Sequence, residues 1–138
     1  MSSEFSAEVQ TIVGPLLTEL GFVLDEVDDS PDPGGRSQHI VFYRSNDCKI
    51  QVYQSSREGE TNCMIAPLGV PNEFGLRAKK WQYLIRFARH PDLPLGELVK
   101  FTRSEYEAYA NPLEWVRDRI LKCYAAAHAG ILEMYGDG

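Results

Sequence analysis

Apolar residues near the start of the chain recur at the three- and four-residue spacing of one helix face. They are Phe5, Val9, Ile12, Val13, Leu16, Leu17 and Leu20, and Gly21 follows them as a helix stop. Pro15 lies inside this pattern and has no backbone N–H to donate. We therefore expect either a kink at Gly14-Pro15 or a short turn followed by a second helical segment that begins at Pro15.

Four short runs after this helix have the composition of β-strands. They cover residues 22–28, 38–45, 48–55 and 61–67, and turn-forming residues separate them. Connections this short join antiparallel neighbours, because parallel strands need long crossovers. In the third run Ile50 and Val52 alternate with Lys49, Gln51 and Tyr53. We therefore expect an antiparallel meander of three or four strands, with one covered face and one partly wet face.

The rest of the chain has helical signals. Within residues 77–89 the helical spacing is set by Trp81, Leu84, Ile85 and Ala88. Thr102 and Glu105 have the spacing of a capping box, which predicts a short helix that reaches Tyr109. The last helix is the best specified, with Asn111 as its cap, Pro112 at its first position and a wide apolar stripe from Leu113 to Met134.

Together these elements predict a single α+β domain over residues 1–138. It has an N-terminal helix, an antiparallel meander of three or four strands, and then two or three helices, of which the long C-terminal one packs on the sheet. A chain of 138 residues with 43% hydrophobic and 25% charged residues fits one such domain. No apolar run reaches the roughly 20 residues of a membrane span, and the N-terminus lacks the features of a signal peptide. We expect a cytoplasmic protein that does not bind membranes.

The cysteines support a reducing compartment. Cys48, Cys63 and Cys123 are odd in number and form no C-x-x-C pair, which argues against zinc and redox motifs. A turn near Glu58-Gly59 would place Cys48 near Leu68 and Cys63 near Tyr53, too far apart for a disulfide. Cys63 and Cys123 lie in apolar patterns and are expected to be inert core thiols.

Negative charge is concentrated at the front of the chain. Residues 1–35 carry eight carboxylates and no Lys or Arg, whereas the remaining 103 residues carry 14 basic and 12 acidic side chains, so the two parts have net charges of -8 and +2. An acidic surface does not suit nucleic acid, whose phosphates need a basic face. The basic side chains of the 77–89 segment are expected to lie near this acidic part.

The stretch "DEVDDSPDPGG", residues 25–35, allows three interpretations. Asp28, Ser30 and Asp32 match the first, third and fifth places of a calcium loop, but Pro33 and His39 occupy the places that require glycine and glutamate. The stretch also has the composition of a solvated turn. The third interpretation is a contact surface for a protein partner. Its candidate residues are Asp25, Glu26, Asp28, Asp29 and Asp32, joined by the aromatic residues Phe74, Tyr106 and Tyr109.

Catalytic and metal-binding signatures are weak. His39, His90 and His128 have no histidine partner at i+4 and no cysteine at ligand spacing, and His90 with Asp92 is typical of a turn at a helix end. No serine or cysteine has the flanking pattern of a nucleophile. We therefore expect no metal and no cofactor, and a binding function rather than an enzyme.

The segments "LLTELGFVLDEV" and "IVFYRSNDCKIQVYQSS", followed by a tryptophan-bearing segment, resemble small acidic bacterial proteins of unknown function, including immunity-like proteins of polymorphic toxin systems. The resemblance covers about residues 10–90. It implies a domain that blocks a toxin by binding it, and the acidic segment would suit a basic toxin such as a nuclease.

Two alternatives stay open. Secretion chaperones of the type III class are similar in size and acidity and also begin with a helix before strands, but their pattern returns to strands after a middle helix. Such a protein would be a homodimer that binds an extended segment of an effector-like partner. The other alternative is a small enzyme with a pocket near the 68–77 loop.

Overall fold

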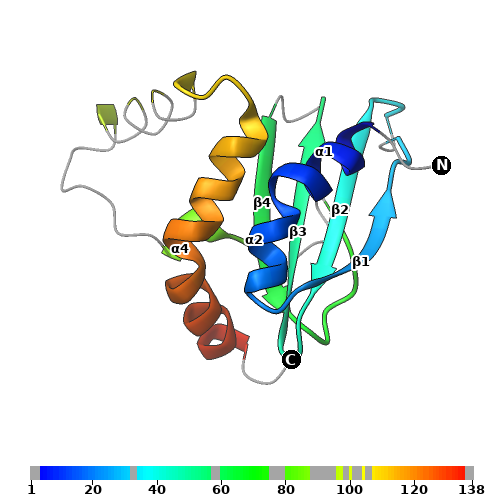
Figure 1. Cartoon of the computed structure of the whole chain (residues 1–138). Coiled ribbons are helices and arrows are strands. Elements are labelled where there is room, and N and C mark those ends of the chain that lie inside the picture. Colours follow the sequence, from blue (N-terminus) through cyan, green and yellow to red (C-terminus); the bar gives the residue numbers. More distant parts are fainter. Residues whose placement is uncertain are drawn as a thin grey trace.

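The computed structural model describes residues 4–31, 34–56, 60–74, 80–87, 96–97, 100, 104 and 107–135. Its first helix, α1 (Glu4–Ile12), is followed at once by α2 (Gly14–Glu19), as Figure 1 shows. The break at Val13 confirms that the N-terminal apolar stripe is divided into two helical segments, with Pro15 in the first turn of the second. Gly21 ends α2 with a φ of 90°, the left-handed conformation expected of a glycine helix stop.

An antiparallel sheet of five strands follows, in the order β1–β2–β3–β4–β5. The strands are β1 (Val23–Asp28), β2 (Gln38–Arg44), β3 (Cys48–Ser55), β4 (Glu60–Pro67) and β5 (Gln82–Tyr83). The four predicted strands are confirmed, and β5 is an addition to them. At one edge of the sheet, the pairing of β1 with β2 is irregular between Leu24 and Glu26, which makes Asp25 the extra residue of a bulge.

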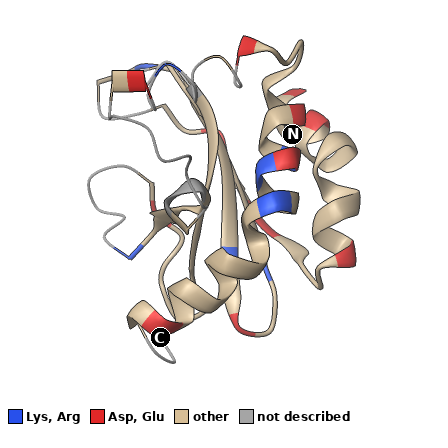
Figure 2. Cartoon of the chain, turned by 90° about the vertical axis from the view of Figure 1, so that its left-hand side faces the viewer, with Lys and Arg blue, Asp and Glu red and all other residues tan. Residues whose placement is uncertain are grey.

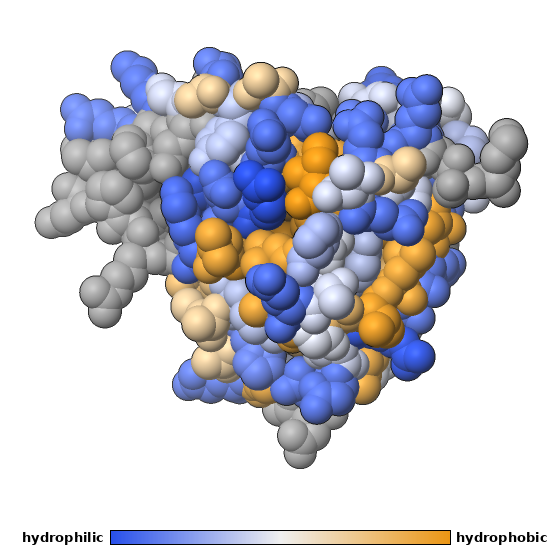
Figure 3. Space-filling model, in the orientation of Figure 1, coloured by the Kyte–Doolittle hydropathy of each residue, from blue (hydrophilic) through white to orange (hydrophobic). Residues whose placement is uncertain are grey.

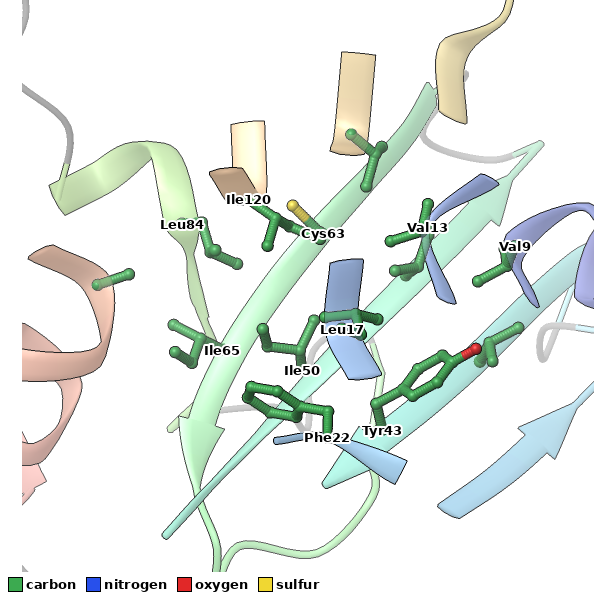
Figure 4. Close-up of a cluster of buried hydrophobic side chains, with 14 of the residues drawn as sticks. Val9, Val13, Leu17, Phe22, Tyr43, Ile50, Cys63, Ile65, Leu84 and Ile120 are labelled. Carbon is green, nitrogen blue, oxygen red and sulfur yellow. The ribbon is translucent and has the colours of Figure 1, made fainter. Parts of the chain in front are cut away.

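One face of the sheet is covered by α1, α2 and α4 (Pro112–Tyr135), so the α+β architecture is confirmed. α4 begins where the sequence predicts, because the amide of Leu113 donates to the side-chain oxygen of Asn111 (2.9 Å). Figure 4 shows the apolar core between these helices and the strands. Its fully buried members include Val9, Val13, Leu17, Ile50, Val52, Ile65, Leu84, Ile120 and Ile131.

The opposite face carries a second, smaller apolar cluster and is partly wet as predicted, since Tyr83 opposite Met64 is 38% exposed and Arg44, two residues after Phe42, is exposed. The cluster contains Ile40, Phe42, Tyr53, Met64, Ala66, Val70 and Trp81. Figure 2 shows the sheet nearly edge-on, with α1 and α2 on one side of it. The other side is covered by residues 68–74, whose Val70 and Phe74 pack on this cluster. The sequence did not predict this covering segment, because residues 68–74 are irregular and have no periodicity.

Two expectations are corrected. The helix expected around Trp81 is replaced, over its described part, by β5 and by the short 3-10 helix η2 (Leu84–Phe87). The register of β3 and β4 differs by one residue, since Cys48 pairs with Pro67 and Cys63 with Val52. All three cysteines are nevertheless buried and outside any disulfide. Burial was predicted for Cys63 and Cys123, and the structure adds Cys48 to them.

The basic segment before η2 is also placed differently from the expectation. Lys80 lies over the ring of Tyr135 at the end of α4, 5.8 Å from its centroid, and it precedes β5, which lies at the opposite end of the strand order from β1. Arg77, Lys79 and Arg89 lie outside the described residues, as does the capping box of Thr102 and Glu105. Near that box, the amide of Ala108 donates to the Ser104 carbonyl (3.1 Å), which is the hydrogen bond of a helical turn.

Candidate functional site

The carboxylates singled out in the sequence gather along one edge of the sheet. Asp25, Glu26 and Asp28 belong to β1 and Asp29 follows it directly; we call these four residues the acidic edge. Among the described residues β1 pairs with β2 alone, so its outer backbone N–H and C=O groups face away from the sheet. Asp32 lies outside the described residues.

Side chains from neighbouring elements order the acidic edge. The Nδ2 of Asn72 donates to Asp25 Oδ2 (2.9 Å) and to Glu26 Oε1 (2.8 Å). Asn72 is itself held by Lys49, whose Nζ donates to the Asn72 Oδ1 (3.0 Å). Arg44 Nε lies 3.5 Å from Asp25 Oδ1 in an ion pair whose arginine side chain is 56% exposed. This ion pair offsets the charge of one of the four carboxylates of the edge.

The calcium-loop interpretation finds no support in the described part of the stretch. Asp28 Oδ1 accepts a hydrogen bond from the amide of Ser30 (2.9 Å), which is the local bond of an Asx turn. This bond favours the interpretation of residues 28–31 as a solvated turn that closes β1.

The aromatic candidates have structural contacts. Phe74 is half-buried and packs on Tyr53, with 4.5 Å between the ring centroids. Tyr109 is half-buried and its hydroxyl donates to Asp118 Oδ2 on α4 (2.6 Å). Tyr106 lies outside the described residues. Of the predicted contact residues, the carboxylates of the acidic edge are therefore the ones that lie together in the described structure.

A pocket of about 390 Å³ opens where the start of α1 meets the start of α4. Its lining includes Glu4, Glu8, His39 and Thr61. The Nδ1 of His39 lies 2.9 Å from Asp29 Oδ1, which joins this pocket to the acidic edge. Two carboxylates and a histidine–aspartate pair suit a cationic group such as a lysine or arginine side chain. The pocket expected near the 68–77 loop is a different place, because residues 68–74 do not line this one.

A second polar constellation lies at the turn between β2 and β3, where it meets the middle of α4. We call Ser45, Asp47, Cys48, Tyr124 and His128 the turn cluster. His128 Nε2 lies 2.8 Å from Asp47 Oδ2, and the rings of His128 and Tyr124 stack with 5.3 Å between centroids. Ser45 Oγ donates to Asp47 Oδ1 (3.1 Å) and lies 3.5 Å from Cys48 Sγ.

The acid–base properties of the turn cluster follow from these contacts. Burial opposes ionisation of Asp47 and alone would raise its pKa. The hydrogen bond and the charge of His128, together with hydrogen bonds from Ser45 and Cys48, have the larger effect and lower the pKa of this carboxyl. Burial raises the pKa of the Cys48 thiol to about 11, helped by the nearby Asp47 charge. Burial, with the charge and hydrogen bond of Cys48, raises the pKa of Tyr124 well above its ordinary range.

Sequence reasoning missed the partners of both described histidines. His39 meets Asp29 across 10 positions, and His128 meets Asp47 across 81 positions, so neither pair has a short-range spacing that a motif search detects. The first pair is foreseeable from the antiparallel pairing of β1 with β2. The second depends on how α4 crosses the sheet, which no local pattern fixes.

None of the described helices is long and apolar enough to cross a membrane. Comparisons of the chain with protein-family models, with curated proteins and with solved structures found no match.

Proposed function

We propose that this protein is a non-catalytic binding domain that recognises a basic protein partner through the acidic edge, as an immunity-type inhibitor of a basic toxin would. The observation that carries the proposal is the concentration of Asp25, Glu26, Asp28 and Asp29 along an outermost strand. The same charge argues against nucleic acid as the ligand.

An edge strand offers a partner both backbone and side-chain contacts. The outer backbone groups of β1 can pair with an extended segment, and the exposed side chains of Val23 (58%) and Leu24 (45%) add apolar area at its start. The surface in Figure 3 has an apolar band among hydrophilic residues on this side of the molecule. A partner strand would therefore meet apolar contacts at one end of β1 and carboxylates along the rest.

The acidic edge favours a basic partner over a second copy of this chain. Charged residues and bulges on edge strands are features that keep identical edges apart. Two copies of the acidic edge would bring eight carboxylates together, whereas a basic segment would find opposite charge at each of them. The bulge at Asp25 also twists the strand and disfavours a long, flat pairing with itself.

The hydrogen bonds of the acidic edge prepare it for binding. Asn72 fixes Asp25 and Glu26, and the Ser30 amide fixes Asp28, so these side chains lose little conformational freedom when a partner arrives. The adjacent pocket with Glu4 and Glu8 offers a place for one long basic side chain of the same partner.

The test compares two variants that remove the same charge. One carries Asp25→Asn, Glu26→Gln, Asp28→Asn and Asp29→Asn; the control carries Glu19→Gln, Glu107→Gln, Glu114→Gln and Glu133→Gln on the helices and the turn before α4. The partner probe is the purified product of a toxin-like gene directly upstream in the native host. We expect the edge variant to associate at least about 10-fold more slowly at low salt and to lose the salt dependence of the rate.

The control variant should associate almost as fast as the wild-type protein, because it keeps all four carboxylates of the acidic edge. Equal rates for both variants would show that net charge, and not the acidic edge, matters. An upstream product that is not basic, or that does not bind, would remove the immunity-type proposal. A stable homodimer in sedimentation, lost when Val23 and Leu24 are replaced by serine, would favour the chaperone alternative.

A further inference from the structure

We propose that Asp47, Cys48 and His128 of the turn cluster form a binding site for a zinc ion. The ligand atoms of these three side chains all lie within 4.8 Å of one another, although the residues come from a turn and from a helix that are far apart in the sequence. This site is separate from the acidic edge, and the inference does not depend on the proposed function.

The spacing of the three ligand atoms is close to what zinc requires. Zinc binds sulfur, imidazole nitrogen and carboxylate oxygen at about 2.0–2.3 Å in a tetrahedral arrangement, which places neighbouring ligand atoms roughly 3.3–3.8 Å apart. In the structure His128 Nε2 and Asp47 Oδ2 are 2.8 Å apart, which is hydrogen-bond distance. Small rotations of these two partly exposed side chains would replace this contact by a cation bound between them.

The cluster has the supporting contacts that metal ligands usually have. Ser45 Oγ touches both Asp47 Oδ1 and Cys48 Sγ, so it orients two of the three ligands. The turn itself is ordered, because the Ser45 amide donates to the Cys48 carbonyl (2.9 Å) and the Cys48 amide donates to Ser45 Oγ (3.2 Å). The ring of Tyr124 stacks on His128 with an interplanar angle of 22°, which holds the imidazole plane.

The mixture of donors selects the metal. A thiolate, an imidazole and a carboxylate together suit zinc, whereas calcium and magnesium prefer oxygen ligands alone. Three protein ligands leave the fourth tetrahedral position to water or to a group from a ligand. Binding would release the thiol proton of Cys48 to solvent, and His128 would bind through Nε2 as a neutral imidazole that carries its proton on Nδ1.

The arrangement is less suited to nucleophilic catalysis, which also uses cysteine, histidine and a carboxylate. The Cys48 residue is 0% exposed, so a substrate carbonyl has no path to its sulfur. The side chains of His128 (32% exposed) and Asp47 (41% exposed) are open to solvent, so a small cation can arrive from that side.

The experiment uses the untagged, metal-free full chain with zinc chloride, and with cobalt(II) chloride as a spectroscopic probe. We expect one equivalent of zinc to bind in competition with a chromophoric chelator and to raise the melting temperature. Cobalt should give the absorption band of a thiolate ligand. His128→Gln should weaken zinc binding at least about 10- to 100-fold, since loss of even an outer partner of a metal ligand has that effect. Cys48→Ser should abolish the cobalt–thiolate band.

Matched controls keep the result interpretable. Cys123→Ser changes another buried thiol and His39→Gln changes another histidine paired with an aspartate, and both should bind zinc like the wild-type protein. His128 is partly exposed, so His128→Gln should fold even if Cys48→Ser does not. Zinc binding that survives in His128→Gln, or a wild-type cobalt complex without a thiolate band, would overturn the proposal.

Discussion

The two faces of the sheet are covered in different ways. On one face α1, α2 and α4 lie on fully buried aliphatic side chains, and the helices satisfy their own backbone hydrogen bonds. On the other face residues 68–74 have no regular structure, and side chains of the sheet and of Trp81 satisfy their carbonyls. Lys49 Nζ donates to the Val70 carbonyl (2.9 Å), Gln51 Nε2 to the Glu73 carbonyl (2.9 Å), and Trp81 Nε1 to the Pro71 carbonyl (3.1 Å).

This difference explains why polar residues occupy buried positions in β3. An irregular segment that covers a sheet must find partners for its backbone groups, since a buried carbonyl without a hydrogen bond is costly. Lys49 and Gln51 supply these bonds from the face that the alternation marks as polar. The polar residues Lys49 and Gln51 of β3 therefore serve the covering segment as hydrogen-bond donors.

The largest expected effect tests how rigidly the helices and residues 68–74 pack on the two faces of the sheet. Ile65→Ala opens a cavity under the helices and Ile40→Ala opens one under residues 68–74, and both positions are almost completely buried. The cost of such a change is typically about 2–5 kcal/mol and is larger where the surroundings cannot collapse into the cavity. We expect Ile65→Ala to lie near the top of that range and Ile40→Ala near the bottom.

Denaturant unfolding of both variants measures these costs as losses in the free energy of unfolding. The two substitutions remove the same atoms from the same kind of strand, so each serves as the control of the other. Equal losses would mean that the irregular cover resists collapse as strongly as the helices do.

The same contrast shows what the sequence can and cannot reveal. The stripe of α4 and its Asn111 cap depend on neighbouring residues, and both are predictable. The cover formed by residues 68–74 depends on three side-chain-to-carbonyl bonds between distant positions, so it gave no periodic signal. The segment after Trp81 has helical spacing, but pairing with β4 and contact with α4 gave it a short strand and a 3-10 turn instead.

The acidic edge and the turn cluster also differ in how far the sequence predicts them. The acidic edge lies in one strand and was foreseeable from its composition, although Asn72 as its organiser was not. The turn cluster joins residues 47 and 128 through the path of α4 across the sheet, and only the fold brings them together.

An intermediate effect is expected for the polar attachment of the irregular cover. Lys49→Met keeps the length of the side chain but removes its bonds to the Val70 carbonyl and to Asn72. Hydrogen bonds of this kind, made by a charged donor, contribute about 1.5–3 kcal/mol, so unfolding should become easier by roughly that amount. Amide hydrogen exchange of residues 68–74 should accelerate more than that of α4.

Lys122→Met on the exposed side of α4 is the matched control, and it should change stability by less than about 0.5 kcal/mol. Unchanged exchange in residues 68–74 of the Lys49→Met variant would contradict the idea that this lysine attaches the segment to the sheet.

The smallest expected effect concerns the pH dependence of stability. It comes from one of two buried tyrosines, which lie on opposite faces of the sheet. The hydroxyl of Tyr53, under the irregular cover, donates to the Tyr83 hydroxyl (3.2 Å). On the helix face, burial raises the pKa of Tyr43 above its ordinary value of 10.0. Because the folded state disfavours the ionised form, Tyr43 stabilises the fold fully below the unfolded pKa, and this contribution is lost as the pH rises through 10 toward the folded pKa.

Tyr43→Phe removes this titration while keeping the ring that packs under the helices. The variant should resemble the wild-type protein near neutral pH and lose less stability than it between about pH 8 and about pH 11. Cys48 and Tyr124 also have raised pKa values, so both proteins should still become less stable in alkali, and the informative quantity is the difference between their two curves. Parallel curves of stability against pH would show that the Tyr43 hydroxyl reaches water in the folded protein. The helices would then pack less tightly over Tyr43 than the buried apolar core implies.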